Sequence, residues 1–522
     1  MRITNKIIQN NELSNMNTNK IYRDKLSSQM STQKKINRPS DDPVAAIRSL
    51  RLRSDVTEIT QYYSKNIPDA SSWLEVTEGA LNSLSQVITN MIDQYTKGAS
   101  GQLATSDRQI LQEELKKLAE EVYATADADY AGRFVFTGYR TDTSLSFTGD
   151  ETKLYSITEQ LDNTAIDTVT VVDTYGTDAG GNKVSLMDMN AGNYSSIPVE
   201  ETDISSYEVH RLRLAYQDGD DTPPPTLRFG KDADGAFSDS ITAVMIHSYN
   251  DPYSQVGDTP PEQPLIYVPE TGELLMSEAV YSQLMTIKDD LSTSGVNESE
   301  IRVTYEKSAW KKGDLRPEHY FYAESGSVEY NASYLDDYGL AGSGETRQVI
   351  EYDVGFNQTI RINTRADEAF QPGIGREVEE LMGALDSLSS LEQLSADLEE
   401  LLQKADTGTA GGIQDRLDAV NKALVFQQDK VQKMFEGGIT SMQRYLDATS
   451  LALTNCGTRG SKLELIENRT KTQKTTFETL KSTNEDIDVT EVAIQLTSAE
   501  FTYEAALMAS GKILQASLLN YI

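Results

Sequence analysis

The chain has 522 residues, a length that favours more than one domain. Its formal net charge of −34 excludes a nucleic-acid-binding protein that relies on clustered Lys and Arg. The single cysteine, Cys456, excludes an intrachain disulfide and a thiolate metal cluster.

The negative charge is concentrated in the middle of the chain. Residues 1–139 contain 17 basic and 17 acidic side chains, whereas residues 140–370 contain 16 basic and 41 acidic ones. We interpret this surplus as a solvated acidic surface that favours solubility. The first residues lack the apolar core and cleavage site of a secretory signal, and no stretch approaches 18 consecutive apolar residues. We therefore expect no cleaved signal and no membrane span.

The N-terminal third is predicted to be helical, beginning with a weak segment. Residues 1–40 are rich in Asn with sparse apolar positions, so we expect an assembly segment that is helical only when packed. Residues 41–139 are predicted to form the N-terminal half of a helical rod. Asp42 suits an N-cap and Pro43 suits the first helical position, while Pro68 predicts a kink or restart. The next helix has strict three-four spacing at Leu74, Thr77, Leu81, Leu84, Ile88, Met91 and Tyr95.

The acidic middle, residues 140–370, has the pattern of a mainly β domain inserted between helices. Short alternating runs at 168–172, 210–216 and 301–305 predict strands. Residues 265–268 and 273–276 flank a Pro-Glu-Thr-Gly sequence and predict a hairpin. Residues 279–291 predict an isolated helix.

Helical periodicity returns for the rest of the chain. Residues 371–488 are predicted to form the C-terminal half of the rod, with one helix closing near residues 407–412 and a very long one following it. Gly457 to Gly460 predict a weak point in the long helix. Residues 489–522 carry a stripe that predicts an assembly helix in need of a partner. The stripe and its flanking apolar positions include Val489, Val492, Leu496, Ala499, Tyr503, Leu507, Ile513, Leu514 and Leu518. The fold class is therefore α+β, an antiparallel helical rod with a β insert.

The residues that carry chemistry do not form a convincing active site. His210, His247 and His319 are far apart in sequence and lack zinc-protease spacing. Ser510-Gly511-Lys512 lies inside a helical pattern and lacks the first glycine of a phosphate loop. The calcium-loop-like sequence at 232–235 has Gly230 and Ile241 where carboxylates are needed. We predict no enzyme, no cofactor and no metal.

Residues 34–43, Lys-Lys-Ile-Asn-Arg-Pro-Ser-Asp-Asp-Pro, contain two prolines four residues apart just before a helix. On spacing alone, a local capping turn is favoured over a polar contact with a neighbouring subunit. With Leu26-Ser27-Ser28, this segment resembles the N-terminal motif of flagellins and flagellar hook–filament junction proteins. Residues 131–138, Ala-Gly-Arg-Phe-Val-Phe-Thr-Gly, are similar to the segment that ends the N-terminal rod in the hook-associated protein 3 group. One residue departs from the pattern, because Gln33 stands where the family usually has Gly.

The resemblance, which covers the first 140 residues and the helical C-terminus, implies a structural subunit of the bacterial flagellum. It implies export by the flagellar type III apparatus, an extracellular location, and a position at the hook–filament junction. The implied partners are other copies of the chain, hook-associated protein 1, flagellin and an export chaperone, with no nucleic acid and no membrane. The predicted subunit interface consists of Arg38, Pro39, Asp41, Asp42, Val489, Val492, Leu496, Tyr503, Leu507, Ile513, Leu514 and Leu518.

Three other functions stay open, one of which is a coiled-coil scaffold of the cytoplasm. A flagellin-type filament subunit shares the helices at both ends, and the 131–138 segment and the insert favour the junction protein over it. An adhesin or enzyme domain displayed on a flagellar rod belongs to a different class. The lack of recognisable metal-ligand and nucleophile motifs counts against the enzyme.

Overall fold

The computed structural model describes residues 5–100, 104–177, 183–190, 192–197, 199–232, 236–287, 299–335, 348–406 and 410–519. The chain forms two compact units. Unit 1 comprises residues 1–71, 352–360 and 461–522, and unit 2 comprises residues 72–351 and 361–460. The helices α3 (Ile67–Ala99) and α8 (Ala410–Glu485) contribute residues to both units.

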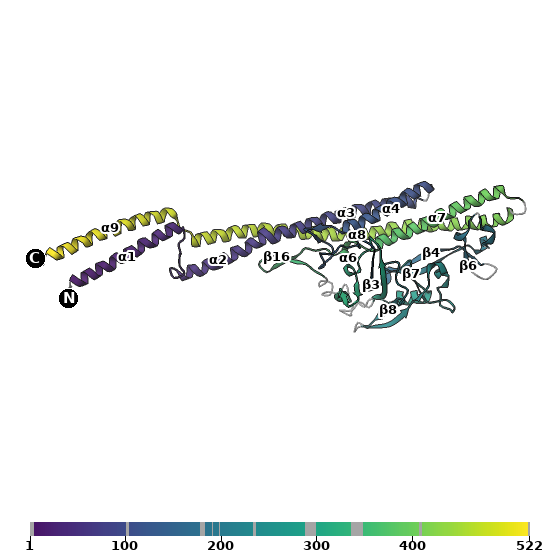
Figure 1. Cartoon of the computed structure of the whole chain (residues 1–522), viewed down its shortest axis with the longest axis horizontal. Coiled ribbons are helices and arrows are strands. Elements are labelled where there is room, and N and C mark those ends of the chain that lie inside the picture. The colour runs from purple at the N-terminus through teal and green to yellow at the C-terminus, as the bar shows by residue number, and fades with distance from the viewer. Residues whose placement is uncertain are drawn as a thin grey trace. The chain divides into compact units, whose positions relative to one another are not determined.

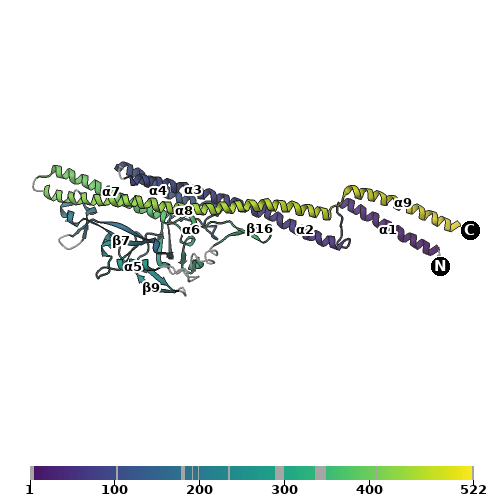
Figure 2. The ribbon, with the colours of Figure 1, turned by 180° about the vertical axis from the view of Figure 1, so that it is seen from behind.

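Unit 1 is built from helices of the two ends of the chain. The helix α1 (Asn5–Thr32) lies antiparallel to α9 (Val489–Leu519), and α2 (Pro43–Gln61) lies beside the end of α8 (Figures 1 and 2). The Asp42 side chain caps α2 by accepting hydrogen bonds from the N–H groups of Val44 and Ala45, and Pro43 is the first helical residue. Both predictions for this helix start are confirmed.

Pro68 interrupts the regular α-helix through the turn that precedes it. Residues Tyr62–Asn66 form a π-helical turn in which the Ile67 N–H donates to the Tyr62 carbonyl. Proline has no N–H to give to the carbonyl four residues earlier, and a wider turn relieves the clash of its ring with that carbonyl. The helix therefore restarts just before Pro68, as the sequence predicts.

The helices of unit 2 are α3, α4 (Thr105–Ala126), α5 (Glu278–Thr286), α6 (Ala366–Ala369), α7 (Gly373–Lys404) and α8. The predicted stripe of α3 is buried throughout, from Leu74 to Tyr95. The Tyr95 and Phe435 rings pack edge to face, with centroids 5.9 Å apart. Each ring lies against a glycine of the opposite helix: a Cβ at Gly438 would lie 2.2 Å from Tyr95, and one at Gly98 would lie 2.2 Å from Phe435. The glycines therefore let α3 and α8 approach closely.

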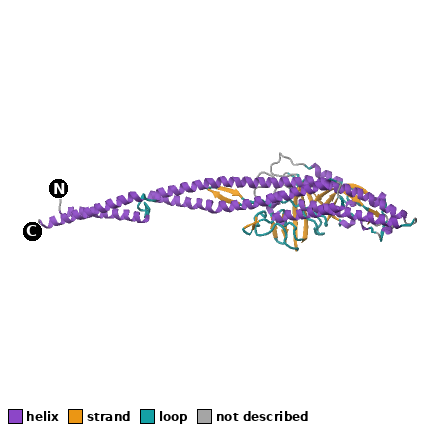
Figure 3. Ribbon diagram, turned by 90° about the horizontal axis from the view of Figure 1, so that it is seen from above, coloured by secondary structure: helices purple, strands orange, loops and turns teal. Residues whose placement is uncertain are grey.

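Two larger sheets form the mainly β part of unit 2 (Figure 3). The five-stranded sheet has the order β10 (Val244–Met245), β11 (Leu265–Val268), β12 (Glu273–Met276), β7 (Ser205–Arg213) and β4 (Ile166–Asp173). The six-stranded sheet has the order β15 (Val328–Tyr330), β14 (Tyr322–Ser325), β3 (Glu151–Leu161), β13 (Ile301–Trp310), β8 (Thr226–Lys231) and β9 (Phe237–Thr242). The predicted hairpin is the pair β11–β12, in which Val268 faces Glu273.

Three short strand pairs complete the described strands: β1 (Asp129–Tyr130) with β2 (Arg133–Phe134), β5 (Tyr175–Thr177) with β6 (Lys183–Ser185), and β16 (Glu351–Gly355) with β17 (Gln358–Arg361). The predictions of an α+β fold, with N- and C-terminal helices packed together and a central β region, are confirmed.

Three boundaries differ from the sequence predictions. The helix α8 runs through Gly457 and Gly460 without a break, because Cys456 is buried and Arg459 donates a hydrogen bond to the Asn363 carbonyl at 2.7 Å. These contacts outweigh a helix penalty of about 1 kcal/mol per glycine. The strand predicted at 210–216 ends at Arg213. The helix predicted at 279–291 ends at Thr286, and residues 288–298 lie outside the described residues.

A buried cluster of charges joins the five-stranded sheet to α7. The Arg211 guanidinium on β7 donates to Asp167 at 2.9 and 3.1 Å and to Glu380 at 2.8 and 2.9 Å. It also pairs with Glu273 on β12. Arg213 adds a bond of 3.0 Å to Glu380. The Arg211 side chain is only 6% exposed, so its partners replace the water that it has lost.

We predict that Arg211→Met destabilises unit 2 by about 3–5 kcal/mol, because it leaves the Glu273 and Glu380 carboxylates without their main counter-ion. Calorimetry should show a lower temperature for the unfolding transition of this unit. The control Arg228→Met removes an exposed cation from β8 and should change the transition little. An equal, small shift for both variants would contradict a stabilising role for the cluster.

Candidate assembly surface at the paired chain ends

The two terminal helices bury one apolar seam between them. Leu26 of α1 packs with Val492 and Ala499 of α9, and Met30 and Leu496 flank this small core. Farther along the pair, the Arg23 guanidinium lies 4.7 Å from the centre of the Tyr503 ring. The partner predicted for the C-terminal stripe is therefore the N-terminal segment of the same chain.

A second apolar row lies on the opposite face of α9. Ile494, Phe501 and Met508 repeat every seven residues and are 67%, 75% and 67% exposed. Ile494 and Phe501 lie two positions beyond Val492 and Ala499 of the seam, which is a rotation of about 200° around a helix. A surface helix with apolar residues on opposite faces is typical of a helix packed on both sides. We call these three residues the outer row.

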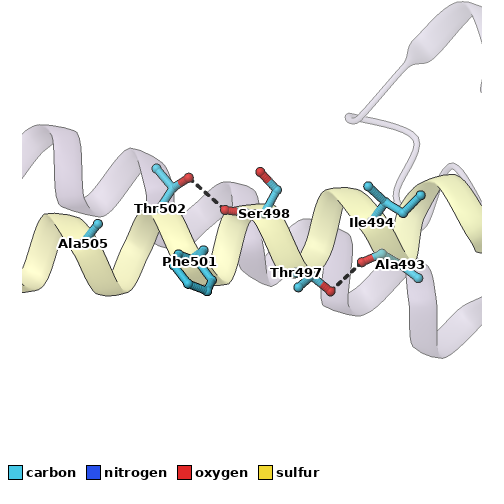
Figure 4. A pocket seen from close by; sticks show the side chains of 7 residues that line it. All are labelled: Ala493, Ile494, Thr497, Ser498, Phe501, Thr502 and Ala505. Carbon is cyan, nitrogen blue, oxygen red and sulfur yellow. Dashed lines mark hydrogen bonds between the residues drawn. The ribbon is translucent and has the colours of Figure 1, made fainter.

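Small side chains next to the outer row form shallow grooves. Ala493, Thr497 and Ala505 lie beside Ile494 and Phe501 on α9, and the Thr497 and Thr502 hydroxyls donate to the carbonyls of Ala493 and Ser498 (Figure 4). Because these hydroxyls are used within the helix, they leave the groove walls largely apolar. On the side toward α1, a second groove is lined by Asn19, Tyr22, Ile494, Gln495, Ser498, Ala499 and Thr502.

A joint of charged residues holds the start of this helix pair against the end of α8. The Glu485 carboxylate accepts hydrogen bonds from Arg53 at 2.6 and 2.8 Å and from the Ser49 hydroxyl at 2.5 Å. Lys34 pairs with both Glu485 and Asp486, and the Lys35 N–H donates to the Glu485 carbonyl at 2.7 Å. The joint therefore ties residues from three separate segments together.

Electrostatics fix the ionised state of this joint. The hydrogen bonds from Arg53 and Ser49 lower the pKa of Glu485 to about 2, although burial opposes the shift. The hydrogen bond from Lys34 lowers the pKa of Asp486. The Glu485 side chain is only 5% exposed, so these partners stabilise an anion that has lost most of its water.

The turn before α2 adopts the conformation that glycine favours. Gln33 has a φ of +56°, and its carbonyl accepts a hydrogen bond from the Ile487 N–H at 3.2 Å. A residue with a side chain costs roughly 1–2 kcal/mol in this left-handed region. The chain therefore keeps the turn even though Gln33 replaces the glycine that the family pattern expects there.

The predicted interface residues of α9 fall into three groups. Val492, Leu496 and Tyr503 lie on the seam, whereas Val489 and Leu507 are exposed. The side chains of Ile513, Leu514 and Leu518 lie outside the described residues, although α9 includes their backbone.

The remaining predicted residues, Arg38, Pro39, Asp41 and Asp42, lie in an exposed turn. The Asp41 carboxylate accepts the Arg38 N–H at 3.0 Å, so this aspartate holds the turn through the backbone. Together with the Asp42 cap, this bond gives the motif a local role, and its place in a subunit interface stays a prediction.

The sequence analysis missed the outer row and the joint. Seven-residue spacing could have revealed Ile494, Phe501 and Met508, but the neighbouring stripe concealed it. The partners of Glu485 are more than 400 residues away in sequence, and no local pattern indicates such a pairing.

Among the residues that the structure describes, no three or more His, Cys, Asp and Glu side chains are grouped so as to hold a metal ion. Nor is any helix there long and apolar enough to cross a lipid bilayer.

Comparison with known proteins identifies the N-terminal region. Residues 3–141 match the family described as the bacterial flagellin N-terminal helical region. The chain is 27% identical over 143 residues to flagellar hook-associated protein 3 of Salmonella typhimurium, covering 27% of this chain and 45% of that protein. It is 30% identical over 122 residues to a flagellin of Clostridium tyrobutyricum, covering 23% and 32% of the two chains. The chain thus spans less than half the length of these relatives.

A solved structure of the flagellar junction protein FlgL from Legionella pneumophila aligns with 76% of this chain and 99% of its own, at 12% identity and a TM-score of 0.22. The sequence matches therefore show a flagellin-type N-terminal region, and the similarity to hook-associated protein 3 and to flagellin extends over less than a third of the chain.

We predict that Glu485→Gln weakens the joint by about 1–3 kcal/mol, because Arg53 and Lys34 lose a buried charged partner. Amide hydrogen exchange should become faster at the start of α2 and α9. Glu478→Gln, on the exposed face of the same helix, is the matched control and should exchange like the wild type.

The pH dependence follows from the lowered pKa. The stability that Glu485 contributes is complete above about pH 4.5 and is lost as the pH falls toward 2. The difference in stability between the wild type and Glu485→Gln should therefore shrink as the pH falls across that range. A difference that persists unchanged at pH 2 would contradict the role of this carboxylate.

Proposed function

We propose that the protein is a structural subunit of the hook–filament junction of a bacterial flagellum. The observation that carries the proposal is the outer row of α9, an exposed apolar face on a helix whose opposite face already packs against α1. Neighbouring subunits would cover this face through head-to-tail contacts of the kind that build helical assemblies. The partners would be other copies of the chain, hook-associated protein 1 and flagellin.

The similarity to hook-associated protein 3 supports the junction, whereas the similarity to a flagellin supports the alternative of a filament subunit. The segment 131–138 favours the junction because it resembles the corresponding segment of junction proteins. In the structure its Ala131 and Gly132 form the turn of the β1–β2 hairpin, and both have positive φ. The shape of that hairpin would then belong to the junction role.

Export and location follow from the same proposal. The subunit would pass through the flagellar type III apparatus, bound beforehand by an export chaperone, and would reach the extracellular flagellum without a cleaved signal. The terminal helices suit such a route, because the seam between them is small and can open at low cost.

We predict that cells lacking this gene carry hooks without filaments and release flagellin into the medium, as seen by electron microscopy and by immunoblotting of the supernatant. Immunogold labelling of wild-type flagella should mark one position at the base of each filament. Labelling along the whole filament would support the filament-subunit alternative, and normal filaments in the mutant would contradict both functions.

A further inference from the structure

Unit 2 contains a cleft of about 700 Å³ between the five-stranded sheet and two helices. Its walls are β4 with the residues that follow it, the turn Pro252–Gln255, the middle of α7, and α8 at Gln427 and Lys430. Clefts of this volume are typical of small-molecule sites in proteins.

The cations that line the cleft differ in their partners. Arg213 pairs with Glu377 at 2.8 Å and with Glu380 at 3.0 Å. Arg376 donates to the Gln217 side chain at 3.1 Å and to the Thr271 carbonyl. Lys430, by contrast, has no hydrogen bond and no ion pair to any residue that the structure describes.

The carboxylates whose charges act on Lys430 already have other hydrogen-bond partners. Glu380 and Glu273 both accept hydrogen bonds from Arg211, and Glu273 also accepts them from the hydroxyls of Tyr253 and Thr271. Burial lowers the pKa of Lys430, and Glu380 opposes this shift only from a distance. The lysine is therefore a partly buried ammonium group that lacks a hydrogen-bonded counter-ion among the described residues.

The opposite wall supplies further donors and an apolar surface. The strand β4 is at the edge of its sheet, and residues 171–174 line the cleft in succession, so its main chain forms part of the wall. Main-chain groups at a free strand edge can donate hydrogen bonds to a ligand. Val169, Val171 and Tyr175 add apolar surface beside the hydroxyls of Thr174, Ser248 and Ser387.

We propose that this cleft binds a small hydroxylated monocarboxylate, with the carboxylate on Lys430 and the uncharged body along β4. Asp173 and Glu379 also line the cleft and would repel a ligand with several negative charges. A phosphate monoester carries about −1.5 to −2 at neutral pH and is therefore a poorer fit. The inference concerns a cleft within unit 2 and does not depend on the junction role.

The experiment is calorimetric titration of the full chain with gluconate, with sorbitol as the uncharged analogue and glycerol 3-phosphate as the phosphate analogue. Gluconate should bind with a millimolar Kd, and the Lys430→Met variant should bind it at least tenfold more weakly. Lys430→Arg should retain binding. Lys433→Met, which removes an exposed lysine paired with Asp429 on the same helix, should bind like the wild type.

A second measurement uses only the wild type, in case Lys430→Met does not fold. Gluconate should slow the chemical acetylation of Lys430, measured by peptide mass spectrometry, without slowing that of Lys433. Equal binding of sorbitol and gluconate, tighter binding of glycerol 3-phosphate, undiminished binding by folded Lys430→Met, or no protection of Lys430 would each overturn the proposal.

Discussion

The seam between α1 and α9 is the interaction on which the ends of the chain depend. An Asn-rich helix such as α1 gains little from its own propensity, and its apolar residues are too few to hold it alone. It is ordered by packing on α9 around Leu26, Val492 and Ala499. That core is small, so the pair can form and open readily, as the proposed export before assembly would require.

The joint at Glu485 gives this marginal helix pair a defined starting point. Its carboxylate holds Arg53 and Ser49 of α2, while Lys34 and Lys35 bring the end of α1 to the same place. From there α9 presents the outer row on exposed turns of the helix beyond the seam. The helix α9 thus has one apolar face packed on α1 and a second apolar face exposed, which is the physical basis of the proposed assembly surface.

Periodicity and capping predicted the elements that depend on local sequence: the α9 seam, the start of α2 at Asp42 and Pro43, the α3 stripe and the β11–β12 hairpin. Sequence reasoning was wrong where tertiary contacts overrode local preference, as at Gly457 in α8, where buried Cys456 and the Arg459 hydrogen bond keep the helix intact. It could not find Glu485 or Arg211, because their partners come from distant segments. Charge alone showed only that the middle of the chain is acidic, and not that Arg211 pairs with Asp167 and Glu273 from this region and with Glu380 from α7.

The central claim is that the outer row of α9 is covered by neighbouring subunits in the flagellum. It is tested most directly by returning the Ile494→Ser/Phe501→Ser double variant to cells that lack the gene and counting filaments by electron microscopy. The matched control is Leu465→Ser/Leu480→Ser, which changes two exposed leucines of α8. If the account holds, the purified double variant keeps the helix content and unfolding temperature of the wild type, yet its cells carry bare hooks while control cells carry filaments. Normal filaments on cells with the double variant would contradict it.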